Sequence, residues 1–300
     1  MAGQGNSIRA ILFALGANFV IFVTKGIAAF ITGSGAMLAE TVHSLADCGN
    51  QLLLLLGLRQ AQTPPSPDYP LGYGKAIYFW SFLVAVILFS VGGMFSLYEG
   101  IHKLQHPEPL RQWWWAVAVL VVSIIAEAVS MRACLVEVNK ARGSRSLARW
   151  FRESRQAELI VIFGEDLAAL LGLILALLAV VLAVITNNPM WDAIGTLAIG
   201  VLLIVIAVFV AIEVKAMLIG QSADPEVSAQ MKQFLDERTD VARVFNLITL
   251  QLGDDVMVAV KCQVRHAGAS AEETINNIES EFQRRFPQVK WSFFEPDNAD

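Results

Sequence analysis

Six long apolar stretches separated by short polar segments dominate the first 220 residues of the chain. Each stretch reaches or exceeds the ~20 residues that an α-helix needs to cross ~30 Å of hydrocarbon. The last two are long enough to tilt or to extend beyond the bilayer. The pattern therefore predicts six transmembrane helices, at Ile8–Ile31, Ala36–Leu58, Ile77–Ile101, Trp113–Leu135, Ala157–Ile185 and Pro189–Ile219.

The pattern changes at Gly220, after which the chain resembles a small soluble domain. Asp224-Pro225-Glu226 predicts the start of a helix that runs to about Arg238, since proline and acids favour a first helical turn. Two β-rich runs follow, with the turn residues Gly253-Asp254-Asp255 between them. The runs are Val241–Leu252 and Val256–Val264.

Ser270 and Glu273 have the spacing of a capping box, which predicts a second helix ending near Phe286. A last strand is expected at Val289–Phe294. The order α-β-β-α-β predicts a small α+β domain with one antiparallel sheet. We therefore expect a six-helix transmembrane domain at residues 1–220 and a cytoplasmic domain at residues 221–300.

Composition agrees with a membrane protein. Hydrophobic residues make up 55% of the chain and charged residues only 16%, whereas soluble domains carry about 25% charged residues. The net charge of −5 gives no indication of a nucleic-acid partner. The three cysteines form no C-x-x-C pair and predict neither a disulfide framework nor a thiolate metal site.

Basic residues predict the orientation. The loop between the fourth and fifth helices is rich in Lys and Arg, whereas Lys103 and Arg111 are the basic residues of one loop on the opposite side. Because positive charge concentrates in cytoplasmic loops, both termini are expected in the cytoplasm. Met1–Ser7 lacks a basic region and a cleavage site, so no removable signal peptide is expected.

Two polar residues, His43 and Asp47, interrupt the second apolar stretch one helical turn apart. Residues at i and i+4 share a helix face, so the imidazole and the carboxylate project together. A carboxylate at membrane depth costs roughly 2.5–3.5 kcal/mol, which makes function the default explanation. His and Asp also supply half of a tetrahedral site for Zn²⁺. The alternative is a pair that only hydrogen-bonds to a neighbouring helix.

A second acidic cluster, Glu165-Asp166, lies in the fifth stretch. From a rise of ~1.5 Å per residue, Asp166 is roughly 16 Å from the cytoplasmic side of a ~30 Å core. On the same scale His43 is about 18 Å and Asp47 about 12 Å from that side. These depths predict one metal site near mid-membrane with His43, Asp47, Asp166 and Glu165 as ligands.

Further polar residues in the membrane have open alternatives. Glu40 either orients the His43 imidazole or is hydrated at the helix end. Glu127 pairs with Arg132, joins the ion path or relays protons. Asp192 is expected in a first helical turn, where the helix dipole favours it. Lys25 is expected to extend its ammonium to the membrane surface.

Three segments resemble the cation diffusion facilitator family of divalent-metal transporters. They are Glu40–Asp47, Leu71–Lys75 and Asp166–Gly172. Phe79-Trp80-Ser81 and Glu165-Asp166 resemble most the branch that contains mammalian zinc transporter 9. The resemblance implies a homodimer that exports Zn²⁺ or a similar ion in exchange for protons, with copper-chaperone-like (ferredoxin-like) carboxy-terminal domains that meet in the dimer.

The family's site also uses a His or Asp four residues before the fifth-helix Asp, where this chain has Ile162. Glu165 is the nearest substitute, turned ~100° from Asp166 around the helix. A local rotation, a bridging water or Glu127 could complete the ligand set. An added oxygen ligand would make the site harder and could admit Mn²⁺, Co²⁺ or Fe²⁺.

Accessory metal sites of the family are only partly matched. Tyr69 and Tyr73 stand where some members have metal-binding His, so that site is expected to be absent. Glu295 and Asp297 match positions that bind metal in some relatives, while Lys261 occupies another ligand position.

These observations favour a Zn²⁺/H⁺ antiporter that works by alternating access, uses no cofactor and is not an enzyme. The alternatives are a Mn²⁺, Co²⁺ or Fe²⁺ exporter of the same fold and a metal-binding or assembly protein that does not transport. An intramembrane metalloenzyme would need a run such as H-E-x-x-H, which is missing. A bacterial inner membrane is the expected location.

Overall fold

The computed structural model describes residues 4–265 and 270–298, and it divides into two compact units. The first, called the helical unit below, comprises Met1–Leu56, Trp80–Ser144 and Glu158–Glu213. The second, called the C-terminal unit, comprises Gly57–Phe79, Arg145–Ala157 and Val214–Asp300.

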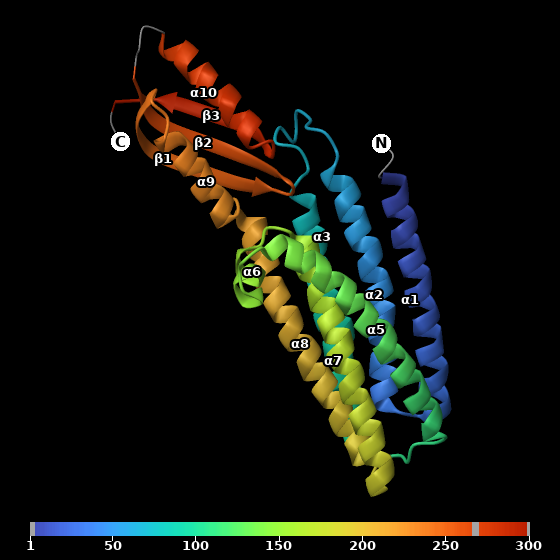
Figure 1. Cartoon of the computed structure of the whole chain (residues 1–300). Coiled ribbons are helices and arrows are strands. Elements are labelled where there is room, and N and C mark those ends of the chain that lie inside the picture. Colours follow the sequence, from blue (N-terminus) through green and yellow to red (C-terminus); the bar gives the residue numbers. More distant parts are fainter. Residues whose placement is uncertain (1–3, 266–269, 299–300) are drawn as a thin grey trace. The chain divides into compact units, whose positions relative to one another are not determined.

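All six predicted apolar stretches form helices, and their axes run roughly parallel or antiparallel to one another (Figure 1). The third stretch is a continuous run of α3, a π-helical segment η1 and α4. The elements are α1 (Gln4–Thr32), α2 (Gly35–Ala61), α3 (Ala76–Ile87), η1 (Leu88–Met94), α4 (Phe95–Gln105), α5 (Trp113–Arg142), α7 (Ala157–Thr186) and α8 (Met190–Ile219).

Four of the described helices are long and apolar enough to cross a membrane: Ala76–Gln105, Trp113–Arg142, Ala157–Thr186 and Met190–Ile219. Within α1, Asn18–Thr32 is a shorter apolar helix. Helix α2 carries the polar residues discussed above, which lower its hydropathy. The predicted fold class, a helical membrane protein with a small sheet domain, is confirmed.

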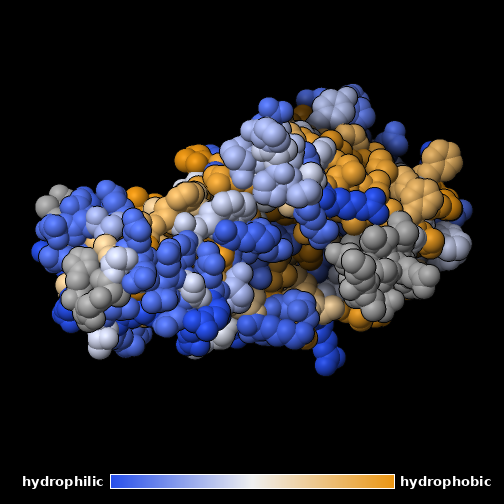
Figure 2. All heavy atoms as spheres, turned by 90° about the horizontal axis from the view of Figure 1, so that it is seen from above, coloured by the Kyte–Doolittle hydropathy of each residue, from blue (hydrophilic) through white to orange (hydrophobic). Residues whose placement is uncertain are grey.

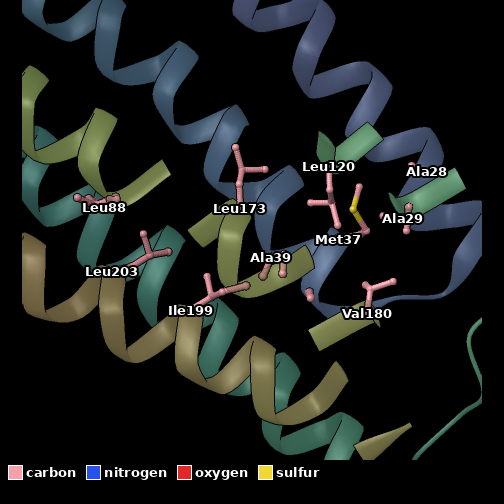
Figure 3. Packing of buried hydrophobic residues seen from close by; sticks show 14 of the residues in the cluster. Ala28, Ala29, Met37, Ala39, Leu88, Leu120, Leu173, Val180, Ile199 and Leu203 are labelled. Carbon is pink, nitrogen blue, oxygen red and sulfur yellow. The ribbon is translucent and has the colours of Figure 1, made fainter. Parts of the chain in front are cut away.

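The core of the helical unit alternates small and large side chains. Ala28, Ala29 and Ala39 are buried next to Leu120, Leu173 and other large residues (Figure 3). Small residues let helix backbones approach closely when no water is available to drive their association. Large apolar side chains also face outward: Phe30 is 92% exposed. Figure 2 shows such hydrophobic surface in orange beside hydrophilic surface in blue.

Glycines bring η1 and α4 into close contact with α8. A β-carbon at Gly93 would lie 2.5 Å from Ile204 Cγ1, and one at Gly100 would lie 2.6 Å from Leu197 Cγ. Only glycine leaves this space, so the two helices pack backbone against side chain. This contact fixes α4 along α8.

Asp192 lies in the first turn of α8, as predicted. Its carboxylate also caps the start of α2, accepting hydrogen bonds from Ser34 Oγ at 2.5 Å, Gly35 N at 2.7 Å and Ala36 N at 3.4 Å. The free N–H groups and the dipole of a helix start favour a negative charge at this point. Asp192 thereby fixes where α2 begins.

The C-terminal unit has the predicted order α-β-β-α-β. Its elements are α9 (Pro225–Asp236), β1 (Val241–Leu252), β2 (Asp255–Val264), α10 (Ala271–Arg285) and β3 (Val289–Pro296). Asp224 caps α9 by accepting from Glu226 N at 2.9 Å, and Ser270 forms the predicted capping box with Glu273. The aromatic residues Phe234, Phe282 and Phe286 pack together under the sheet.

The prediction of a fully antiparallel sheet is wrong. The strand order is β1-β2-β3, with β1 and β2 antiparallel but β2 and β3 parallel. Helix α10 connects β2 to β3 and carries the chain back to the starting end of β2, which is the connection that parallel strands require. The sequence pattern of a strand does not show whether the strand runs parallel or antiparallel to its neighbour in the sheet.

Two connections in this unit have more structure than their sequence suggested. Residues 62–75 form a turn-rich loop, in which a β-carbon at Gly74 would lie 2.0 Å from Leu252 O. Gly253 N also donates to the hydroxyl of Tyr78 at 2.9 Å. The basic loop contains an unpredicted helix, α6 (Leu147–Glu153), and its buried Arg145 pairs with Asp224 at 2.7 Å.

Candidate metal site

His43 and Asp47 occupy one face of α2, as their spacing predicted. The His43 side chain is 1% exposed and that of Asp47 15% exposed. His43 Nε2 lies 3.7 Å from Asp47 Oδ2, which is longer than a hydrogen bond. The two groups are close but do not satisfy each other.

Unsatisfied polar atoms are concentrated on this face. Among the described residues, the buried side-chain atoms without a hydrogen-bond partner include both ring nitrogens of His43 and Oδ1 of Asp47. Asn50 Oδ1 and Gln51 Oε1, which follow Asp47 by about one turn of α2, belong to the same group. Because nearly all buried polar atoms in proteins are paired, this face of α2 is a candidate binding site.

Helix α7 contributes Glu165 and Asp166, which have different surroundings. Glu165 is buried and accepts a hydrogen bond from Asn50 Nδ2 at 2.5 Å. Asp166 is half-buried and accepts only a 3.3 Å contact from Ser130 Oγ of α5. The charge of Asp47 interacts with both carboxylates. Asp166 is therefore the more available of the two as a ligand.

Ile162 lies one turn before Asp166 and is 39% exposed, so this turn of α7 supplies no donor. Glu127 of α5 is half-buried and interacts electrostatically with Asp47 and Asp166. Among the ion pairs of the described residues, none joins Glu127 to Arg132. The charge of Glu127 therefore acts on the same carboxylates, Asp47 and Asp166, that form the candidate site.

The prediction for Lys25 is wrong. Its side chain is fully buried, with the ammonium 3.2 Å from Glu40 Oε2 and donating to Ser44 Oγ at 2.8 Å. A carboxylate within reach inside the helical unit pairs with the ammonium, so extension to the surface is unnecessary. Glu40 Oε2 is thereby occupied by Lys25, while Glu40 Oε1 has no hydrogen-bond partner.

Two glycines make room for these groups. A β-carbon at Gly172 of α7 would lie 2.5 Å from Glu40 Oε1, which explains why glycine follows Asp166 by six residues. A β-carbon at Gly92 would lie 4.0 Å from His43 Nδ1. Gly92 belongs to η1, and π-helical segments are frequent at functional sites.

The donors are not yet arranged around one point. Within the described parts of the chain, no group of three or more His, Cys, Asp or Glu side chains is placed to hold a metal ion. The ligand set His43, Asp47, Asp166 and Glu165 therefore stays a prediction. An ion bound by this set would require α2 and α7 side chains to move toward each other.

Sequence reasoning missed Asn50, Gln51, Ser81 and Ser130, which are polar residues near or within this group. Asn50 and Gln51 follow His43 by seven and eight residues, so helical spacing alone places them on its face. Ser81 of α3 is fully buried, and its hydroxyl is another unsatisfied atom. No sequence signal pointed to Ser130, because α5 meets α7 only in the tertiary structure.

The second candidate site, at Glu295 and Asp297 in the C-terminal unit, already contains the positive charge of the Lys261 ammonium. Asp297 Oδ2 lies 3.1 Å from Lys261 Nζ. Glu295 and Lys261 line one groove of about 230 Å³ together with Asn246. A lysine ammonium beside both carboxylates opposes binding of a second cation there.

Comparison with known proteins identifies the family. The model of the cation efflux transmembrane domain matches residues 11–219, which covers most of the chain. The chain belongs to the cation diffusion facilitator family. The predicted resemblance is confirmed, and the protein is an integral membrane protein. Members of this family are transporters and not enzymes.

Two similar proteins are named proton-coupled zinc antiporter SLC30A9, mitochondrial. The one from Xenopus laevis is 31% identical over 255 residues, which cover 84% of this chain and 45% of the relative. The one from Homo sapiens is 30% identical over 247 residues, covering 82% and 44%. This chain thus spans less than half the length of these relatives. The manganese efflux system protein MneP of Bacillus subtilis (strain 168) is 24% identical, covering 97% of this chain and 96% of the relative.

Proposed function

We propose that this protein is a divalent metal cation transporter, and specifically a Zn²⁺/H⁺ antiporter that exports metal from the cytoplasm by alternating access. The ion binds at His43, Asp47 and Asp166, with Glu165 as the fourth ligand. The observation that carries the proposal is the set of buried, unpaired donor atoms on α2, together with the charge interaction between Asp47 and Asp166 of α7.

The donor chemistry supports exchange of a metal for protons. An imidazole and carboxylates bind Zn²⁺ only in their deprotonated forms, so protons compete with the metal for the same atoms. In the inward-open state the ligands take a cation from the cytoplasm. In the outward-open state, protonation of the ligands releases the cation. The protein with protonated ligands then returns to the inward-open state and releases the protons to the cytoplasm. Similarity to proteins named as proton-coupled zinc antiporters supports this coupling.

Manganese is the second candidate. Ile162 removes one nitrogen or oxygen ligand of the family's usual set, and every remaining donor except His43 is an oxygen. Oxygen ligands favour harder ions such as Mn²⁺. The relative named as a manganese efflux protein also matches this chain over almost its whole length.

The proposal extends to the whole molecule. We infer a transmembrane domain at residues 1–220 and a cytoplasmic domain at residues 221–300, with both termini in the cytoplasm and the protein in a bacterial inner membrane. The functional form is a homodimer. The concentration of basic residues in the loops on one side of the predicted topology supports this orientation.

Flux measurements in proteoliposomes test the function. Purified protein is reconstituted, a pH gradient is imposed, and entry of Zn²⁺, Mn²⁺, Co²⁺ and Fe²⁺ is followed with indicator dyes. We expect Zn²⁺ flux that dissipates the pH gradient and that Asp166→Ala abolishes. Glu158→Gln is the matched control, because it removes a carboxylate from the first turn of the same helix.

Each outcome distinguishes one alternative. Flux of Mn²⁺ without Zn²⁺ would assign the transporter to manganese. Zn²⁺ flux that does not depend on pH would contradict proton exchange. No flux of any of the four ions, from protein that is folded and correctly inserted, would favour a metal-binding or assembly role instead.

A further inference from the structure

The proposed transport site uses one of the four histidines of the chain, and two others form a pair far from it in sequence. His102 lies in the last turn of α4, and His106 follows directly after that helix. Both side chains are exposed, and their ring centroids are 5.2 Å apart. No function proposed above involves these residues.

The separation of the rings is that of a chelating pair. A tetrahedral Zn²⁺ bound to two imidazole nitrogens at ~2.1 Å holds the ring centroids roughly 5 Å apart. The rings are inclined by 35°, so neither lies flat against the other. Chelation requires side-chain rotations that bring one nitrogen of each ring onto a shared ion.

The surroundings favour a cation. The last carbonyl groups of α4 carry partial negative charge at this end of the helix. Glu99 lies one turn before His102 on the same side of α4. The nearby cation, Lys103, is directed elsewhere, because its ammonium donates to the carbonyl of Gly33 at 2.5 Å.

The pair also has a rigid base. Gly100 packs against Leu197 of α8, and the bond from Lys103 joins the end of α4 to the turn between α1 and α2. Little ordering of the backbone is needed before a metal binds, which favours affinity. Tyr98, whose ring centroid is 6.4 Å from that of His102, covers one side of the pair.

We propose that His102 and His106 form a surface binding site for a borderline divalent cation of the Zn²⁺ class. Water completes the coordination shell, since the described residues bring no third His, Cys, Asp or Glu to it. Imidazole ligands select such ions over Mg²⁺ and Ca²⁺. The site lies at the bundle end that carries the α1–α2 turn. If the proposed function holds, this is the exit face, and the pair receives the exported ion.

Binding is tested in full-length protein in nanodiscs carrying Asp47→Ala and Asp166→Ala, so that the proposed transport site is silent. Zn²⁺ binding is measured by equilibrium dialysis with excess Mg²⁺. We expect His102→Gln or His106→Gln to weaken binding at one site on the order of 10²-fold, because the second ligand of a chelate acts at high effective concentration. The matched control is Ile101→His/His102→Gln, which keeps two histidines but separates them around the helix.

A control that binds as tightly as its parent, or single variants that leave Zn²⁺ binding unchanged, would overturn the proposal. Electron paramagnetic resonance of added Cu²⁺ gives an independent readout: two nitrogen ligands are expected in the parent and fewer in each variant. Neither result depends on transport, because the background variant does not transport. Failure of the flux assay would therefore remove the role at the exit face and leave the binding site intact.

Discussion

Asp192 and Asp47 are both carboxylates within apolar helices of the helical unit, yet their surroundings are opposite. Both oxygens of Asp192 accept hydrogen bonds, from the Ser34 hydroxyl and from two backbone N–H groups at the start of α2. Asp47 has one oxygen with no partner, and its neighbour His43 has two unpaired nitrogens. The Asp192 carboxylate is satisfied by hydrogen bonds within the protein, whereas one oxygen of Asp47 accepts no hydrogen bond.

Under the proposed function, this difference separates a structural carboxylate, Asp192, from a functional one, Asp47. A buried carboxylate that accepts from a helix start is satisfied by the protein itself. A buried carboxylate beside an unpaired imidazole is satisfied only by something that enters, and a divalent cation fits these donors. Lys25 and Glu40 are intermediate: the ammonium is satisfied, whereas one oxygen of Glu40 is not.

The largest expected effect is at Asp47. Asp47→Ala removes a proposed ligand, so we expect flux to fall on the order of 10²-fold or more, since even indirect partners of a ligand contribute 10- to 100-fold. Stability is expected to stay the same or to rise, because an unsatisfied buried group is removed. Flux in proteoliposomes and unfolding in a detergent titration measure the two quantities. A clear loss of stability would place Asp47 with Asp192 as a structural residue.

The next effect is at Lys25. Lys25→Met leaves Glu40 buried without its partner charge, and we expect a loss of about 3–5 kcal/mol in the free energy of unfolding. The reversed pair, Lys25→Glu with Glu40→Lys, is expected to recover part of that loss. The same detergent titration measures both variants. Equal stability of Lys25→Met and the unmodified protein would show that the pair contributes nothing.

Asp192→Ala tests the other side of the comparison. It removes a helix cap and leaves buried N–H groups unpaired, so we expect a loss of about 2–3 kcal/mol. Flux per folded molecule is expected to stay close to normal. Comparing Asp192→Ala with Asp47→Ala in both assays gives opposite results if the distinction holds, and parallel results if it does not.

The smallest expected effect is on stability and comes from Asp240, a partly exposed carboxylate of the C-terminal unit. Arg238 donates to both oxygens of Asp240, at 2.8 and 2.7 Å, and these bonds hold the pKa of Asp240 below its usual value. A lowered pKa in the folded state contributes stability above the unfolded pKa of about 3.9. That contribution is lost as the pH falls through the lower, folded pKa.

Hydrogen exchange of β1 and β2, corrected for the intrinsic dependence on pH, measures this loss in the full-length protein. We expect a weak decrease in protection below about pH 4, because the Asp240 side chain is partly exposed and solvent screens the pair. Asp240→Asn is expected to reduce that decrease. An unchanged pH dependence in this variant would show that other carboxylates cause it.

Much of the architecture follows from local rules that the sequence contains. The lengths of the apolar runs predicted all six helices, and Ser270 with Glu273 predicted the start of α10. His43 and Asp47 were expected on one face of α2 because their spacing is one helical turn, and the structure places them there. These features depend on residues close together in the chain.

What the tertiary structure decided concerns partners that are far apart in the chain. The sequence could not show that Lys25 turns inward to Glu40, that Asn50 binds Glu165, or that β3 lies parallel to β2. It predicted Asp192 in the first turn of its own helix, but could not show that this carboxylate also caps α2. Whether a buried carboxylate is satisfied depends on the donors that other helices bring to it, and only the packed structure determines those donors.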